Sequence, residues 1–198
     1  MKKHYIFLVL ILCSIYMVGQ TKGIVYYGQK ESLSLKGPYG PDFNSYLVFN
    51  NEQSLYVTAK DSLDKNTNFK SSYDNQDGTV ALAYAVYTTP YGRQVFYDKK
   101  KDSLYWNQWK NFYVAEKTPK IAWKLDKETK KIGNFTAHKA TGFFRGRTYT
   151  AWYTQEIPLP YGPWKLQGLP GLILEAYDTD KEMYLYFKSL EYPTKTAV

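Results

Sequence analysis

The chain has 198 residues and a formal net charge of +8, with 44% hydrophobic and 18% aromatic residues. Disordered segments are poor in aromatic and β-branched residues, so this composition excludes a disordered chain. A domain of this size buries roughly 70% of the surface that its unfolded chain exposes, so it needs neither disulfides nor a structural metal.

The first 19 residues are predicted to be a signal peptide. Two lysines precede an apolar run over residues 5–18, which is shorter than the ~20 residues of a membrane span, and Gly19 supplies a small residue for cleavage. We expect a single exported β-rich domain over residues 20–198, in the periplasm, at the outer membrane or secreted, with no membrane span after cleavage. A membrane anchor and lipid attachment at Cys13 are the weaker interpretations.

Cleavage removes Cys13, the sole cysteine, and leaves His138 as the sole histidine. Cysteine nucleophiles, cysteine-rich zinc sites and any site with two histidines are then excluded. His138 lies in an alternating polar row that is typical of the solvent-facing side of a strand. We expect no metal and no cofactor: a calcium loop with Gly78 at its sixth position would place Tyr73 and Tyr84 where Asp and Glu are needed, and the acidic residues 178–182 are interpreted as a hairpin turn.

Lysine supplies most of the positive charge, because the chain has only three arginines, Arg93, Arg145 and Arg147. The lysines are scattered among acidic residues, whereas nucleic-acid binding favours a concentrated basic stripe with arginines. No nucleic-acid partner is therefore expected. The lysine runs at 99–101 and 130–131 are predicted to lie in turns or on edge strands.

Short runs of alternating apolar and polar residues predict about eleven strands, and little helix beyond the signal peptide. In chain order the predicted strands are 23–27, 46–49, 55–57, 80–87, 94–97, 104–114, 121–125, 134–141, 147–154, 172–177 and 183–190.

Short turn segments, among them 98–102 and 126–130, separate most of these strands, so neighbouring strands are expected to pair antiparallel. The polar stretch 62–79 is predicted to be a surface loop. The predicted fold class is all-β and mainly antiparallel, and a strongly curved meander sheet, an open barrel and a sandwich all satisfy the pattern.

Residues 121–175 contain a series of specific motifs, namely Phe143-Phe144-Arg145-Gly146-Arg147, Gly162-Pro163-Trp164 and Gly168-Leu169-Pro170-Gly171-Leu172-Ile173-Leu174-Glu175. This series resembles the GLPGLI family, exported proteins of Bacteroidota named for the last string. The resemblance implies export and a β-rich domain, and it carries over no activity, catalytic residue or cofactor. The chain departs from the family at Thr136, where similar proteins often have cysteine. It also ends at Val198, where many members continue, which leaves open a missing last strand.

The last motif also has a structural interpretation. Pro170 and Gly171 suit the central positions of a type II turn, because proline fixes φ and glycine accepts a positive φ. Leu169 precedes a proline and must be extended. The motif is thus predicted to be a corner, entered at Gly168, from which Leu172 and Ile173 enter a buried strand.

Three charged residues lie inside these otherwise apolar motifs. We predict that Arg145 or Arg147 pairs with Glu175 beneath the corner, since such pairs specify geometry more than they add stability. The alternative is that both arginines are exposed.

Trp152, Tyr161 and Trp164 are the candidate binding residues, because rigid aromatic side chains serve binding surfaces well. The first functional hypothesis is a non-enzymatic binding or carrier module, in which the aromatic concave face of the sheet holds an amphiphile, a peptide or a glycan. The second is an interaction subunit that docks to an outer-membrane transporter or assembly complex. The third is a glycan hydrolase with two carboxylates, but the sequence marks out no acidic pair, so no catalytic residue is named.

Overall fold

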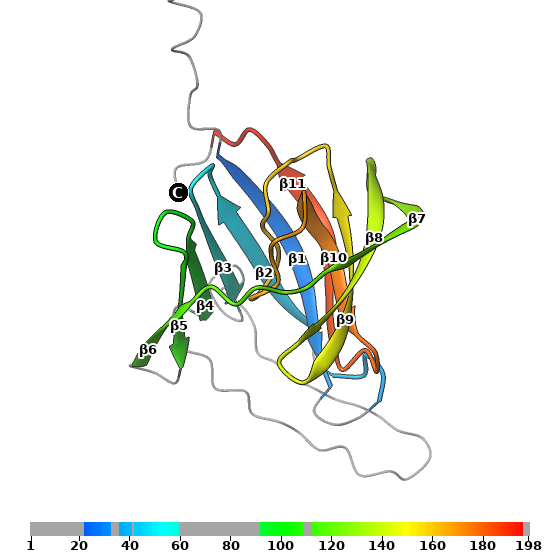
Figure 1. Ribbon diagram of the computed structural model, residues 1–198, viewed down its shortest axis with the longest axis horizontal. Coiled ribbons are helices and arrows are strands. Elements are labelled where there is room, and N and C mark those ends of the chain that lie inside the picture. Colours follow the sequence, from blue (N-terminus) through cyan, green and yellow to red (C-terminus); the bar gives the residue numbers. More distant parts are fainter. Residues whose placement is uncertain (1–21, 33–35, 41, 60–91, 109–111, 196–198) are drawn as a thin grey trace, which may run out of the picture.

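The computed structural model describes residues 22–32, 36–40, 42–59, 92–108 and 112–195. These residues form eleven antiparallel strands in one sheet and no helix (Figure 1). The predicted all-β, antiparallel class is confirmed. The signal peptide, the predicted strand 80–87 and the predicted loop 62–79 lie outside the described residues.

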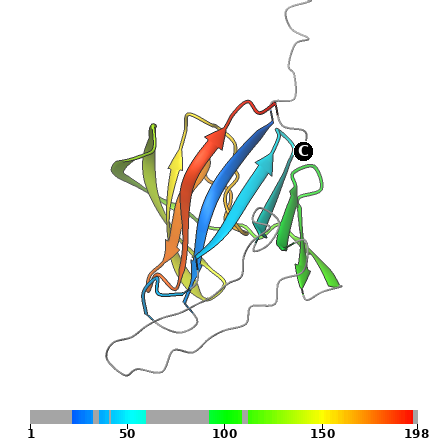
Figure 2. The same cartoon turned by 180° about the vertical axis from the view of Figure 1, so that it is seen from behind.

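The strands are β1 (Gly23–Glu31), β2 (Asp42–Phe49), β3 (Gln53–Ala59), β4 (Arg93–Asp98), β5 (Ser103–Gln108), β6 (Phe112–Lys117), β7 (Lys124–Ile132), β8 (Phe135–Phe144), β9 (Arg147–Thr154), β10 (Leu172–Asp178) and β11 (Met183–Glu191). Their order in the sheet is β6-β5-β4-β3-β2-β1-β11-β10-β9-β8-β7. The first and last strands are thus central neighbours, and a meander extends from each (blue and red in Figure 2). Among the described residues, no helix has the length and apolar character of a membrane span.

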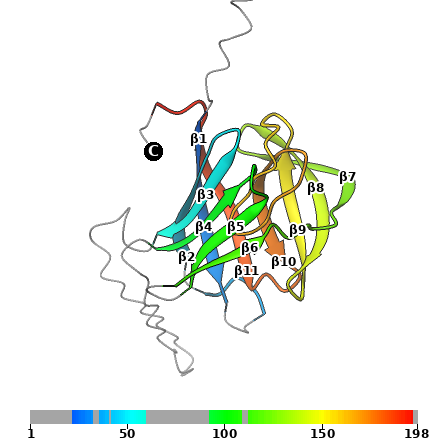
Figure 3. The same ribbon diagram turned by 60° about the vertical axis from the view of Figure 1, so that its left-hand side comes forward.

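The sheet is strongly curved and open, and its concave face is filled by the chain itself. Residues 155–171, here called the plug, leave β9 and cross this face before entering β10. Residues 118–123, here called the strap, run from β6 to β7 on the same side of the sheet (Figures 1 and 3). The concave face on which the carrier hypothesis places a ligand is therefore occupied by the plug.

The plug supplies the core that the curved sheet lacks. Ile157, Leu166 and Leu169 are each at most 3% exposed, and burying such side chains is the main favourable term in folding. The ring of Tyr161 lies 6.1 Å from that of Phe49 on β2 and 5.9 Å from that of Tyr97 on β4. Backbone bonds anchor the plug to β10, where the Ile173 N–H donates to the Tyr161 carbonyl at 2.9 Å.

The corner at Pro170 and Gly171 is not the predicted type II turn. Gly168 has the positive φ, +91°, and Gly171 is not among the residues with positive φ. A Cβ at Gly171 would instead lie 2.1 Å from the backbone oxygen of Thr154. Glycine is required at 171 because β9 approaches the chain closely there, which is its other established use.

The predicted turn at 126–130 is wrong, since these residues lie within β7. The register of β7 against β8 shifts between Leu125 and Thr129, and the Asp126 carboxylate accepts from the Glu128 N–H at 3.0 Å. The side-chain turn that the sequence indicates thus forms, but it produces a bulge and the strand continues. The predicted strand 104–114 is in fact two paired strands, β5 and β6.

Candidate binding pocket

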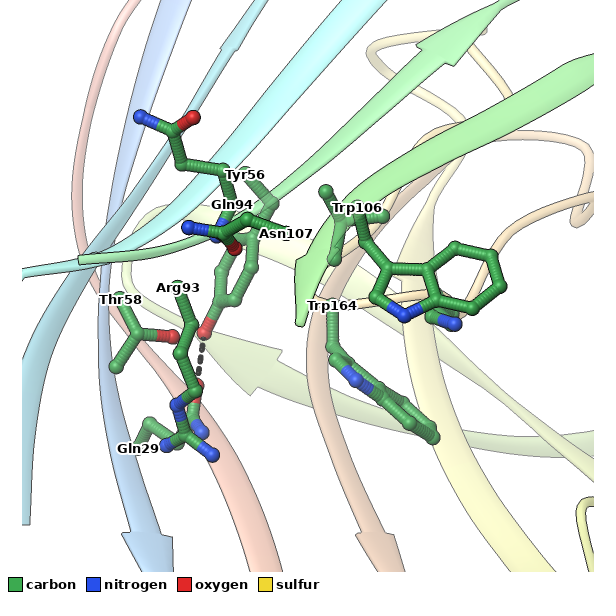
Figure 4. A pocket seen from close by; sticks show the side chains of 10 residues that line it. Gln29, Tyr56, Thr58, Arg93, Gln94, Trp106, Asn107 and Trp164 are labelled. Carbon is green, nitrogen blue, oxygen red and sulfur yellow. Dashed lines mark hydrogen bonds between the residues drawn. The ribbon is translucent and has the colours of Figure 1, made fainter. Parts of the chain in front are cut away.

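A pocket of about 160 Å³ lies between the plug and strands β1, β3, β4 and β5. The indole rings of Trp106 on β5 and Trp164 in the plug lie on one side of it, and Gln29, Thr58 and Arg93 lie on the other (Figure 4). Pockets for drug-sized ligands usually measure ~300–1,000 Å³. This pocket therefore suits one small group, such as a single ring or the end of a longer molecule.

The inner wall is a connected network of polar side chains. The side-chain oxygen of Gln29 accepts from the Tyr56 hydroxyl at 2.5 Å and from the Thr58 hydroxyl at 3.0 Å. The Gln29 amide donates to Glu31, which also accepts from Arg93 at 2.5 Å. Burial raises the pKa of Tyr56 well above its usual range, although its hydrogen bonding with Ser45 and Thr58 opposes the effect. The network therefore holds this wall in one arrangement at neutral pH.

The outer wall carries a buried cation. The Lys165 side chain is 6% exposed, and its Nζ lies 3.0 Å from the centre of the Trp106 ring and 3.3 Å from Glu116 Oε1. Burial lowers the pKa of Lys165, Arg145 lowers it further, and Glu116 opposes both. Cation–π contact with tryptophan compensates part of the lost hydration.

Trp164 is held in a strained backbone conformation. Its φ is +54°, in the left-handed region that bulky residues seldom adopt. Its ring lies 5.7 Å from that of Phe144 and 6.2 Å from that of Tyr149, so packing on β8 and β9 secures it. Strain of this kind often gathers at binding and active sites.

The three predicted binding residues do not come together. Trp164 lines the pocket, whereas Tyr161 is 1% exposed within the core. Trp152 is 4% exposed and lies beneath Lys130, whose Nζ is 4.3 Å from the ring centre. Of the three, only Trp164 is placed to contact a ligand in this pocket.

The predicted pairing of an arginine with Glu175 is wrong. Glu175 pairs with Lys130 at 2.8 Å. Arg147 binds Asp178 and, at 2.6 Å, Glu182, while Arg145 binds Glu116 with both carboxylate oxygens. The register shift in β10 between Ile173 and Glu175 changes which side chains meet, and the sequence alone does not reveal this bulge.

A second hollow lies at the end of β9 and β10, and it is lined by Arg147 together with Asp178, Asp180 and Glu182. Arg147 binds two of these three carboxylates, so the charged side chains that line this hollow carry a net negative charge. Within the described part of the chain, no group of three or more histidine, cysteine or acidic side chains is arranged to hold a metal ion.

Sequence reasoning missed most of the pocket, namely Gln29, Thr58, Arg93, Asn107 and Lys165. These residues belong to four strands and the plug, and no local motif links them. The one available signal was the rarity of arginine, since Arg93 is the only arginine outside the motifs.

The family model described as "Protein of unknown function (Porph_ging)" matches residues 144–175. The matched residues lie within the segment 121–175 that resembles the GLPGLI family. The model carries a different family name, so membership of the GLPGLI family stays a resemblance. No curated protein matches the sequence.

Structures of PNGF-II in two space groups are similar to this chain. They have TM-scores of 0.60 and 0.59 and sequence identities of 16% and 17%. Each similarity covers 90% of this chain and 29% of the PNGF-II chain, so this chain spans less than a third of that protein. At such low identity the likeness shows the fold alone.

Proposed function

We propose that the protein is an exported, non-enzymatic binding module of the cell envelope, which holds a small group of a larger ligand in the pocket beside Trp106 and Trp164. The observation that carries this proposal is the strained Trp164, whose indole completes a pocket with polar groups on its other side. Binding sites typically combine aromatic walls with a few placed polar groups.

Binding is favoured over hydrolysis by the state of the nearby carboxylates. Glu31 is paired with Arg93, and Glu116 is paired with both Arg145 and Lys165. A general acid or base must be free to exchange a proton with the substrate, whereas cationic side chains already occupy these carboxylates. The third hypothesis, a glycan hydrolase, thus gains no support at this pocket.

Native mass spectrometry of the protein purified gently from its own envelope tests the proposal. We expect a retained small mass that is lost in Trp106→Leu and Trp164→Leu. The control is Phe143→Leu, which alters an aromatic residue that is 68% exposed outside the pocket. Retention of the mass by both pocket variants would overturn the proposal, and so would a bare chain whose tryptophan fluorescence responds to no lipid, peptide or glycan.

A second candidate function, an interaction subunit for an outer-membrane or other envelope protein, is favoured by one observation. Phe112 and Tyr113 on the edge strand β6 are 70% and 71% exposed. An edge strand presents unpaired backbone groups that can pair with an extended partner segment. A photo-crosslinking residue at position 113 should trap a defined partner in cells, and one at Phe143 should not; equal labelling from both positions would count against docking at β6.

A further inference from the structure

The charges around the pocket do not cancel. Glu31 is engaged by Arg93 at 2.5 Å, and Glu116 is engaged by Arg145 at 2.5 Å and by Lys165 at 3.3 Å. Three cationic side chains and two carboxylates therefore lie around the pocket, and both carboxylates are already paired. This leaves an excess positive charge at a partly enclosed site, where a charge acts more strongly than in water.

The hydrogen-bonding capacity that remains is that of donors. A guanidinium has five N–H donors, and the described contact of Arg93 with Glu31 uses only Nη2, while the side chain is 47% exposed. Among the described residues, no group accepts a hydrogen bond from the indole nitrogen of Trp106 or Trp164, in contrast to Trp123, which donates to Gln167. Figure 4 shows the Trp164 nitrogen on the side of the ring that faces Arg93 and Gln29.

Two acceptors of the lining are already used. The side-chain oxygen of Asn107 accepts from the Gln94 backbone N–H at 2.7 Å, and that of Gln29 accepts from two hydroxyls. A ligand that fits must therefore bring acceptors, and it gains most if those acceptors are charged.

We propose that the pocket binds an acidic sugar, with the carboxylate on Arg93 and the sugar ring against the indoles of Trp106 and Trp164. This inference rests on the proposed binding function and names its ligand class. A hexuronate ring matches the small volume, offers oxygen acceptors around its edge and presents C–H groups to an aromatic wall. A long acyl chain exceeds the volume of about 160 Å³ and leaves the donors unsatisfied.

Isothermal titration of the purified protein with D-glucuronate and D-glucuronamide tests the charge, because the two differ only in carboxylate against neutral amide. We expect glucuronate to bind about tenfold tighter, in line with the greater strength of charge-assisted hydrogen bonds. Arg93→Gln should abolish that ratio. Lys188→Gln, which removes one exposed charge outside the pocket lining, should preserve it.

Acetate and inorganic phosphate test whether the ring is recognised. We expect both to bind at least tenfold more weakly than glucuronate, and Trp106→Leu to reduce glucuronate binding to the level of acetate. Thermal melts of each variant distinguish lost binding from lost folding. If Arg93→Gln fails to fold, the glucuronate-to-glucuronamide ratio of the unaltered protein still decides the question of charge.

Each contrary result has a separate meaning. Equal binding of glucuronate and glucuronamide would overturn the anionic ligand and leave the binding function intact. Acetate or phosphate binding as tightly as glucuronate would overturn the sugar. Absence of binding by every probe would overturn the acidic sugar, while the mass retained from the native envelope would still decide independently whether the module binds a ligand.

Discussion

The motif segment, residues 144–175, and the pocket meet at Trp164 and Lys165, yet they are built on opposite principles. The motif segment is mostly dry: its plug fills the concave face with apolar side chains, and Gly162 and Gly171 allow close backbone contact. The pocket is lined by side chains from distant strands and surrounded by charges that are paired but not balanced. The difference indicates that the recognisable sequence specifies a scaffold, whereas ligand chemistry is assembled at its margin.

This contrast explains why the motifs name no activity. Arg147 and Glu175, which look like site residues in the sequence, form ion pairs with Asp178 and Lys130 respectively. A motif that positions a plug constrains residues for packing.

Gly171→Val should give the largest effect, because it breaks the scaffold where β9 and the plug meet. A Cβ at this position would lie 2.1 Å from the Thr154 oxygen, which is backbone and cannot move aside. We expect a loss of about 3 kcal/mol or more in the free energy of unfolding, measured by urea denaturation.

Gly146→Ala is the matched control for that substitution. Gly146 has φ +82° and no atom within 4 Å of an added Cβ, so only backbone strain opposes the change. The expected loss is about 1–2 kcal/mol. Equal losses at the two glycines would show that conformation, and not close approach, explains the requirement at 171.

Arg147→Met should rank second, with a loss of about 2 kcal/mol, because it strips the partner from a buried carboxylate while the arginine itself is half exposed. Asp178 is 2% exposed. A double-mutant cycle with Asp178→Asn should show coupling, whereas the cycle with Glu175→Gln should be additive. Coupling between Arg147 and Glu175 would restore the pairing that the sequence suggested and contradict the structure.

The sequence predicted the local structure of the scaffold but not the residues that form the pocket. The strand predicted at 147–154 coincides with β9, because period-two alternation and turn residues report local structure directly. The adjacency of β1 and β11 could not be derived, since nothing local encodes the pairing of strands more than 150 residues apart. The pocket was missed for a similar reason: Gln29 and Trp106 come together only after β1 to β5 have paired and the plug is in place.

Lys165→Met should stabilise the protein at pH 7 by about 1 kcal/mol, because it removes a buried charge that packs on Trp106. Glu116 keeps its two contacts with Arg145 and is not orphaned. Since the pKa of Lys165 is lowered in the folded state, the penalty for burying its charge is present below that pKa. The penalty is relieved as pH rises through the lowered pKa toward 10.5, the unfolded value.

The gain from Lys165→Met should therefore shrink between pH 7 and pH 10, as measured by urea denaturation of both proteins at each pH. The pocket should lose part of its affinity for anions in the same variant. A gain independent of pH would mean that the pKa of Lys165 is the same in the folded and unfolded protein, which would contradict a penalty for burying its charge.

Two buried tyrosine hydroxyls in the core test whether the plug is held by hydrogen bonds as well as by packing. The Tyr27 hydroxyl donates to the Ile173 carbonyl at 2.6 Å. The Tyr161 hydroxyl is buried without a partner among the described residues. Removing a made hydrogen bond destabilises a protein by about 1 kcal/mol, whereas removing an unsatisfied buried group is neutral or favourable.

Tyr27→Phe should thus lower the free energy of unfolding by about 1 kcal/mol, and Tyr161→Phe should leave it unchanged or raise it slightly. Chemical denaturation of the two variants side by side resolves the difference, because both substitutions delete the same oxygen from a side chain that is at most 1% exposed. If Tyr161→Phe costs as much as Tyr27→Phe, the Tyr161 hydroxyl has an acceptor after all, and the plug is bound to the sheet by a polar contact as well as by packing.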